Sequence, residues 1–142
     1  MVKIKRLQHV SIGIEMGRED EARAFYGEAL GLTEKRRPMG LKDRDLIWYD
    51  IGEDEHELHL IRTHVAHFTP VRPGDHLCIE VDDIEGMRAQ CTQHGVTVRE
   101  TSEIDRRPRF FVDDPFGNSI ELVQVSGRFT PVDEPLPHGA KA

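Results

Sequence analysis

Three residues whose side chains commonly bind metal ions, His9, His76 and Glu121, lie in short segments of similar pattern. These segments, QHVSIGI, DHLCIEV and SIELV, alternate apolar with polar residues. Such alternation predicts half-buried β-strands in which successive side chains point to opposite faces. Two imidazoles and one carboxylate suit a divalent transition metal and leave coordination positions for water or substrate. The residue types therefore indicate a metal site, if the fold brings these strands together.

The face on which each of these side chains lies follows from where a helix can pack. Helices cover apolar faces, so they must lie on the side of Val10, Ile12, Leu58, Leu60, Leu77, Ile79, Ile120 and Leu122. The opposite side, which we call the donor face, then carries His9, Glu57, His59, His76 and Glu121. A single histidine on such a face is more often a solvated polar residue. Two histidines that open equivalent strands favour a shared site instead.

The elements that must position these side chains follow one order in each half of the chain. Strands are predicted near residues 7–14, 33–36, 45–50 and 55–62, and again near 76–81, 97–101, 108–113 and 118–125. Apolar residues at helical spacing predict a helix over Glu21 to Leu32 that ends at Gly31. A second helix is predicted to begin after Asp82 or Asp83 as its cap and to end at Gly95. Both halves are thus predicted to be β-α-β-β-β.

The two halves also resemble each other in sequence, which indicates a duplicated module. His9 superposes on His76 with an offset of 67, and Glu57-Leu58 superposes on Glu121-Leu122 with an offset of 64. A drifting offset is expected when loops have been trimmed. The predicted organisation is a first module over residues 1–68, a linker over 69–74, a second module over 75–125 and a flexible tail over 126–142.

Composition narrows the classes of partner and location. The 142 residues carry a formal net charge of -7, which argues against a nucleic-acid partner because such a surface needs a basic stripe. No apolar run approaches the roughly 20 residues that span a bilayer, so no membrane partner is expected. Two cysteines without motif spacing or an export signal indicate a reducing cytoplasm. The basic groups at 35–37 and 106–109 are typical of solvated loops rather than of an anion site.

The stretch DPFGN, residues 114–118, is predicted to be a type I turn, with Asp114, Pro115 and Gly117 at the positions such turns prefer. The turn sets the register of the last strand. With Ile120 and Leu122 on the helix side, Glu121 must lie on the donor face, whereas a slip of one residue would bury it.

Taken in order, QHVSIGI, ARAFYGEALGL, DHLCIEVDDI and FFVDDPFGNSIEL resemble the vicinal oxygen chelate superfamily. This group includes glyoxalase I, bleomycin-resistance proteins and extradiol dioxygenases. The resemblance covers about residues 5–125 and implies an α+β fold. In that fold, two tandem βαβββ modules form a curved, barrel-like mixed sheet with helices on its outer face. It also implies a homodimer, because superfamily members commonly pair modules within or between chains.

The resemblance implies that His9, His76 and Glu121 are ligands of a divalent metal ion. The fourth ligand falls on Glu57 or His59, and the internal repeat favours Glu57. Zinc, nickel, manganese and iron all suit such a set. The ion would chelate vicinal oxygens of a small-molecule substrate, and Glu57 and Glu121 are the catalytic candidates for moving a proton. Candidate substrate contacts are Ser11, His59, Cys78, Arg109 and Phe111, and Cys78 is expected to be a neutral wall residue.

Departures from the family pattern indicate which reaction class of the superfamily this chain is expected to belong to. Phe111 stands where ring-cleaving members usually have a tyrosine, and no histidine lies shortly before it. A metal-dependent, glyoxalase-like lyase or isomerase is therefore favoured over a dioxygenase. The alternative from another class is a small-molecule binding protein of the bleomycin-resistance type, which performs no chemistry. The presence of His9, His76 and Glu121 favours the enzyme.

Overall fold

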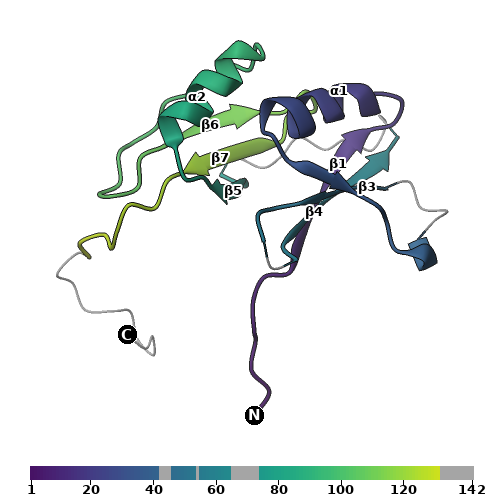
Figure 1. The fold of residues 1–142 in the computed structure, drawn as a ribbon, viewed down its shortest axis with the longest axis horizontal. Coiled ribbons are helices and arrows are strands. Elements are labelled where there is room, and N and C mark those ends of the chain that lie inside the picture. Colours follow the sequence, from purple (N-terminus) through teal and green to yellow (C-terminus); the bar gives the residue numbers. More distant parts are fainter. Residues whose placement is uncertain (42–45, 54, 65–73, 132–142) are drawn as a thin grey trace.

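The computed structural model describes residues 1–41, 46–53, 55–64 and 74–131 of the chain. It contains two sheets that lie side by side (Figure 1). The first sheet has the order β1-β4-β3-β2, with β1 (His9–Glu15), β2 (Thr33–Lys35), β3 (Leu46–Asp50) and β4 (Glu57–Thr63). The second has the order β5-β7-β6, with β5 (Leu77–Glu80), β6 (Arg109–Asp113) and β7 (Ser119–Val123).

The strands of both sheets are connected and paired in the same pattern. The strand before the helix pairs in parallel with the last strand of its half, β1 with β4 and β5 with β7. The remaining ladders, β2 with β3, β3 with β4 and β6 with β7, are antiparallel. The α+β class is therefore as predicted, but the two sheets do not close into a barrel within this chain.

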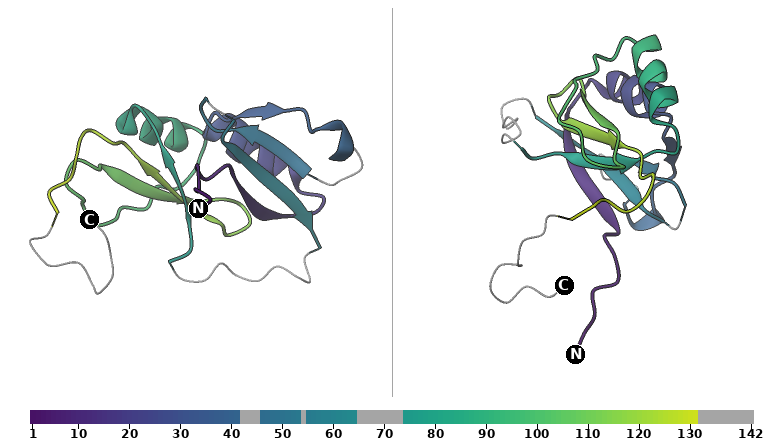
Figure 2. Two further views of the ribbon diagram at one scale, coloured as in Figure 1. Left: turned by 90° about the horizontal axis from the view of Figure 1, so that it is seen from below. Right: turned by 90° about the vertical axis from the view of Figure 1, so that its left-hand side faces the viewer.

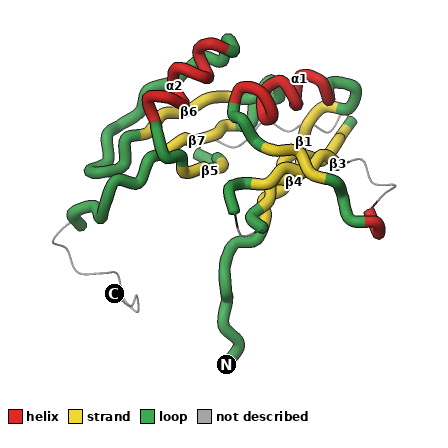
Figure 3. The backbone as a smooth tube through the Cα atoms, viewed as in Figure 1, coloured by secondary structure: helices red, strands yellow, loops and turns green. Residues whose placement is uncertain are grey.

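The helices lie on the same side of both sheets, as the tube in Figure 3 makes plain. Helix α1 (Glu19–Arg23) continues directly into the π-helical segment η1 (Ala24–Ala29), and α2 (Ile84–Gln93) covers the second sheet. A short 3-10 turn, η2, spans Met39–Leu41. Within the described ranges, no helix is long and apolar enough to cross a membrane.

The first helix differs from the prediction in geometry and agrees with it in which residues it buries. Ala22, Phe25, Tyr26, Ala29 and Leu30 are all buried, as their spacing predicted. The wider π-helical winding appears in the bond from Leu30 N–H to the oxygen of Phe25, at 2.9 Å. The segment ends at Ala29 with Leu30 as its cap, and the following Gly31 adopts a positive φ of 74° that other residues rarely tolerate.

The strand predicted over residues 97–101 is reduced to a single bridge between Arg99 and Phe111. The N–H and C=O groups of these two residues exchange hydrogen bonds of 2.7 and 2.9 Å. Within this segment only Val98 packs against the core, together with Val96 just before it. Because Arg99 and Glu100 are exposed, the segment has no further apolar side chains to hold it on the sheet.

One hydrophobic core joins the two halves. It contains the apolar residues predicted to face helices, including Leu58, Leu60, Ile79, Ile120 and Leu122, together with the buried side of the first helix. The view from below in Figure 2 shows the two sheets next to each other along the long axis of the molecule. The predicted linker lies outside the described residues except for Gly74, as does the tail beyond residue 131.

The cap of α2 offers a direct test of the fold. Asp83, not Asp82, is the cap: its Oδ1 accepts a hydrogen bond from Gly86 N–H at 2.9 Å, and its backbone is extended. We expect Asp83→Ala to lower the free energy of unfolding by about 1 kcal/mol, because one N–H at the helix start loses its partner. Chemical denaturation measures this. Asp82→Ala removes the same charge without the bond, and an equal loss in both variants would contradict the assignment.

Candidate functional site

The turn between β6 and β7 is organised by the carboxylate of Asp114. Its Oδ1 accepts hydrogen bonds from the backbone N–H groups of Phe116 at 2.9 Å and Asn118 at 2.8 Å. Gly117 N–H donates to the oxygen of Asp114 at 3.1 Å, and Gly117 has φ +87°. A β-turn at the predicted position is therefore confirmed. It starts β7 in the register that places Glu121 opposite Cys78 on the donor face.

The same turn ties the second half of the chain to the first. The hydroxyl of Tyr26 donates to Asp114 Oδ2 at 2.6 Å, and Asn118 Nδ2 donates both to that oxygen at 2.7 Å and to the oxygen of Gly13 at 2.9 Å. Burial, reinforced by the charge of Asp114, raises the pKa of Tyr26 well above its ordinary value, so the phenol stays a donor. We call Tyr26, Asp114 and Asn118 the buried clamp.

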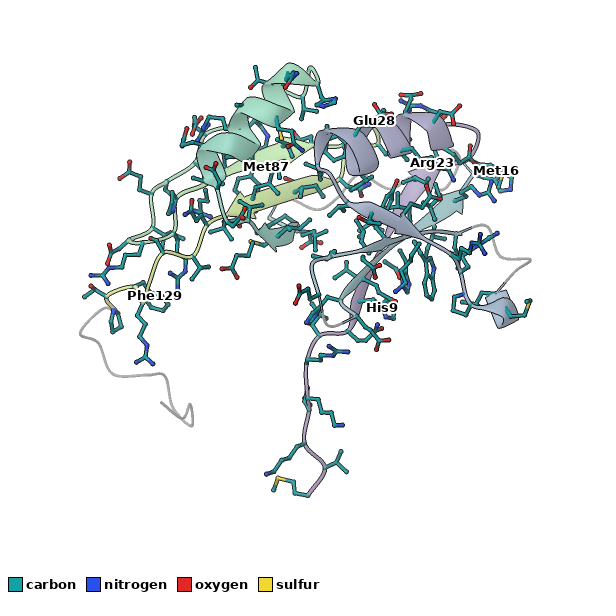
Figure 4. The ribbon with its side chains drawn as sticks, viewed as in Figure 1. His9, Met16, Arg23, Glu28, Met87 and Phe129 are labelled. Carbon is teal, nitrogen blue, oxygen red and sulfur yellow. The ribbon has the colours of Figure 1, made fainter. Side chains whose placement is uncertain are left out.

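The donor face of the first sheet brings together His9, Glu57 and His59, which we call the first half-site. Figure 4 shows His9 at the start of β1, on the side away from the helices. In the parallel ladder His9 lies opposite Glu57. His59 Nε2 lies 2.9 Å from Glu57 Oε2, and Gln8 Nε2 donates to the same oxygen at 3.2 Å. Gln8 Oε1 in turn lies 2.6 Å from His9 Nδ1, so this amide bridges the histidine and the carboxylate.

Three rings are stacked across this half-site. His59 lies between His9, with ring centroids 4.3 Å apart, and Trp48, with centroids 3.9 Å apart and planes inclined by only 6°. Trp48 is the neighbour of His59 in the β3–β4 ladder. The stack holds the His59 ring in place with its Nε2 toward Glu57.

Glu57 is a buried carboxylate with a basic neighbour. Lys35 Nζ lies 2.8 Å from Glu57 Oε1 and 2.8 Å from Asp50 Oδ1. Burial by itself would raise the pKa of Glu57, but the hydrogen bonds from Lys35, His59 and Gln8 outweigh it and bring the pKa to about 2. Glu57 is thus held ionised.

The second half-site consists of His76 and Glu121 on the donor face of the second sheet. Their Nε2 and Oε2 atoms lie 2.8 Å apart. Arg109 Nη1 donates to the other carboxylate oxygen, Oε1, at 2.9 Å, and this guanidinium is also held by the backbone oxygen and hydroxyl of Ser102 at 3.2 Å each. His76 Nδ1 lies 2.8 Å from the oxygen of Gly74. Both half-sites therefore pair a carboxylate with an imidazole and a basic group.

The other predicted contacts border the second half-site. The Phe111 ring meets His76 edge-on with centroids 5.1 Å apart. Burial, with a further contribution from Glu121, raises the pKa of the Cys78 thiol to about 11, so it remains neutral at physiological pH. Ser11 lines, with His76 and Cys78, a pocket of about 600 Å³ between β1 and β5.

The chain brings the candidate ligands together in pairs and not as one set. Among the described residues, no three histidine, cysteine, aspartate or glutamate side chains are grouped so that they could hold a metal ion. His9 and Glu57 belong to the first sheet, and His76 and Glu121 belong to the second.

Sequence reasoning missed Gln8, Lys35 and Trp48, which surround the first half-site. Trp48 lies two residues before Asp50 on β3 and shares its face, so this face could have been read from the period of two. The three-residue strand that carries Lys35 is too short for such a reading. Gln8 precedes the strand, and only the tertiary structure places its amide between His9 and Glu57.

Residues 6–122 match the family model of the Glyoxalase/Bleomycin resistance protein/Dioxygenase superfamily. The chain belongs to this superfamily. No curated protein sequence matches it significantly. The region shared with the superfamily includes both half-sites and the buried clamp.

Several solved structures share this superfamily fold. A Bacillus anthracis protein described as belonging to the glyoxalase family is 32% identical, with a TM-score of 0.78 over 88% of this chain and 98% of that one. The trypanothione-dependent glyoxalase I of Leishmania major is 25% identical, with a TM-score of 0.65 over 85% of this chain and 87% of that one. An antibiotic-binding protein from a Streptomyces species is similar in fold, with 21% identity and a TM-score of 0.69 over 89% of this chain and 100% of that one.

Proposed function

We propose that this superfamily member is a glyoxalase-like, metal-dependent enzyme of the lyase or isomerase type. The observation that carries the proposal is the orientation of the two candidate histidines. In each, Nδ1 lies beside an oxygen acceptor, Gln8 Oε1 at 2.6 Å for His9 and the oxygen of Gly74 at 2.8 Å for His76. A hydrogen bond from Nδ1 selects the tautomer whose Nε2 lone pair can bind a metal, which is the usual arrangement of histidine ligands. Nε2 of His76 lies 2.8 Å from Glu121 Oε2, and metal binding would replace this contact.

Glu57 fits the fourth ligand position better than His59. A carboxylate whose pKa is about 2 accepts protons weakly and stays charged, which suits a ligand of a divalent cation. His59 is stacked between two rings and has its Nε2 against Glu57, so it supports that carboxylate. The proposed set is therefore His9, Glu57, His76 and Glu121, with zinc, nickel, manganese and iron all compatible.

When bound, a divalent ion would act as a Lewis acid toward vicinal oxygens of the substrate. The chain itself would supply the proton transfer. Glu121 is the candidate base because its Oε2 lies at the edge of the second half-site beside His76, while Arg109 holds Oε1. Phe111 and the neutral Cys78 would form an uncharged wall beside it.

A complete centre would require a second copy of the chain, because the half-sites lie on two sheets that do not close on each other. In a two-fold symmetric dimer, the first half-site of one copy can face the second half-site of its partner, and the symmetry then produces two identical centres. A homodimer is thus part of the proposal.

Metal analysis of the purified protein tests the proposal. We expect about one divalent ion per chain in the native protein, and roughly 10- to 100-fold weaker binding or complete loss in His9→Ala, His76→Ala and Glu121→Ala, since each removes one ligand. His94→Ala, a histidine at the end of α2, is the matched control. The binding-protein alternative would be the better account if the native protein carried no metal and the three alanine variants bound added metal ions as the wild type does. That alternative is favoured only by the fold it shares with the Streptomyces antibiotic-binding protein.

A further inference from the structure

One lysine joins three strands of the first sheet on the donor face. Lys35 is the last residue of β2, where it lies opposite Trp48 of β3. Its ammonium lies 2.8 Å from Asp50 Oδ1 on β3 and 2.8 Å from Glu57 Oε1 on β4. The Glu57 side chain is only 10% exposed, whereas that of Asp50 is 37% exposed. The lysine therefore reaches across the sheet to a buried carboxylate of the first half-site.

The two carboxylates that Lys35 contacts are cross-strand neighbours. Asp50 and Glu57 lie directly opposite each other in the antiparallel ladder of β3 and β4. Like charges at such positions repel each other and destabilise a sheet. An ammonium within hydrogen-bonding distance of both removes this repulsion and fixes the orientation of each carboxylate. Lys35 thus balances the charge of Asp50 and, in the same geometry, holds one oxygen of Glu57.

The second half-site holds its carboxylate in the same way. Glu121 Oε1 accepts a hydrogen bond from Arg109, and its Oε2 lies beside an imidazole. Glu57 has Lys35 on Oε1 and an imidazole beside Oε2. In both half-sites the basic group occupies one carboxylate oxygen and leaves the other on the side of the histidines. This repetition in the two modules indicates that the basic group orients the carboxylate.

We propose that Lys35 is the positioning residue of Glu57 and that Asp50 is its counter-charge. Lys35 holds Oε1 of Glu57, so Oε2 is the oxygen that binds the metal. The amide of Gln8 contacts both Glu57 Oε2 and His9 Nδ1, which places this oxygen on the side of His9. Metal binding would replace one of the two contacts that Oε2 now makes. The assignment rests on the proposed function, in which Glu57 is a ligand.

The counter-charge separates orientation from electrostatic repulsion. An unbalanced ammonium beside a divalent cation would repel it. Lys35 and Asp50 carry one positive and one negative charge, so the pair orients the ligand without adding net charge to the centre. The two effects can therefore be measured with different variants.

The test is a titration of the metal-free protein with Co²⁺, followed by the visible absorption that reports the ligand geometry of this ion. Lys35→Met/Asp50→Asn removes the bridge and leaves the net charge unchanged. We expect at least about tenfold weaker binding and a changed spectrum, because Glu57 loses its orientation. Asp50→Asn alone keeps the lysine on Glu57 and leaves the ammonium unbalanced. We expect it to bind Co²⁺ roughly 3- to 10-fold more weakly, with the spectrum of the wild type.

The matched control is Arg23→Gln/Glu34→Gln, which removes another ion pair of β2 without a change of net charge. Figure 4 shows Arg23 on the side of the helices, away from His9. This variant should bind Co²⁺ with the affinity and spectrum of the wild type. Lys35→Arg keeps the charge and the donors, so it should also keep the wild-type spectrum.

Wild-type affinity and spectrum in folded Lys35→Met/Asp50→Asn, or changes no larger than those of the control variant, would overturn the role of Lys35 and leave the proposed metal centre in place. A wild-type protein that binds no Co²⁺ would overturn both. Circular dichroism checks that each variant is folded. If the double variant does not fold, the titration of Asp50→Asn decides, because wild-type affinity in that variant would contradict the role of Asp50 as counter-charge.

Discussion

Chains carrying His9→Ala and chains carrying His76→Ala, when co-expressed, are expected to bind metal that neither variant binds alone. The reason is the separation of the half-sites in one chain. The His9→Ala chain retains an intact second half-site, and the His76→Ala chain retains an intact first half-site. In a mixed symmetric dimer, these two intact halves meet and form one complete centre.

The expected size follows from the statistics of mixing. Random pairing makes half of the dimers mixed, and each has one centre where the native dimer has two. The metal content should therefore be about a quarter of the native value in the unselected mixture, and about half of it after purification through two different affinity tags, which selects the mixed dimers. Sedimentation analysis of the wild-type protein should show a dimer.

The matched control places both defects in the same half-site. Co-expression of His9→Ala with Glu57→Ala should restore far less metal, because every dimer then has an altered first half-site at both centres. If this pair recovers as much metal as the His9→Ala and His76→Ala pair, the centre is not built from two chains. If neither pair recovers any metal while native protein holds it, the four ligands come from one chain.

Asp114→Ala is expected to lower the free energy of unfolding by about 3–5 kcal/mol, the largest stability effect that we predict for a single substitution. The Asp114 carboxylate accepts four hydrogen bonds, from the Tyr26 hydroxyl, two backbone N–H groups and the Asn118 amide. It is 5% exposed, so water cannot replace the lost acceptor. The Tyr26 hydroxyl and the two backbone N–H groups would be left as buried donors without an acceptor, whereas the Asn118 amide would keep its bond to the oxygen of Gly13.

Asp113→Ala is the control for this substitution, because Asp113 is the neighbouring carboxylate and forms an exposed pair with Arg99 at 2.8 Å. Exposed pairs contribute about 0–1 kcal/mol, so this variant should remain close to wild type. Urea denaturation followed by circular dichroism compares the two. Similar midpoints for both variants would show that the buried clamp does not hold the two halves together.

Much of the fold could be predicted because its signals are local. The period of two in residues 9–15 and 57–63 assigned each side chain to a face, and the structure confirms that Leu58 and Leu60 are buried in the core. The turn at 114–118 was readable from the preferences of aspartate, proline and glycine. The bridge at Arg99 was misread as a strand because burial, and not pattern, decides how far an edge segment pairs.

The sequence by itself determined that His9, Glu57, His59, His76 and Glu121 share the donor faces, since alternation along a strand needs no knowledge of the rest of the chain. Only the tertiary structure decided that these residues form two half-sites with different basic neighbours, Lys35 and Arg109. The physical reason is the range of the contacts involved. Tyr26 meets Asp114 across 88 residues, and Asn118 meets Gly13 across 105. Packing between segments so distant leaves no periodic signal in the sequence, yet it sets the two sheets side by side and separates the two pairs of candidate ligands.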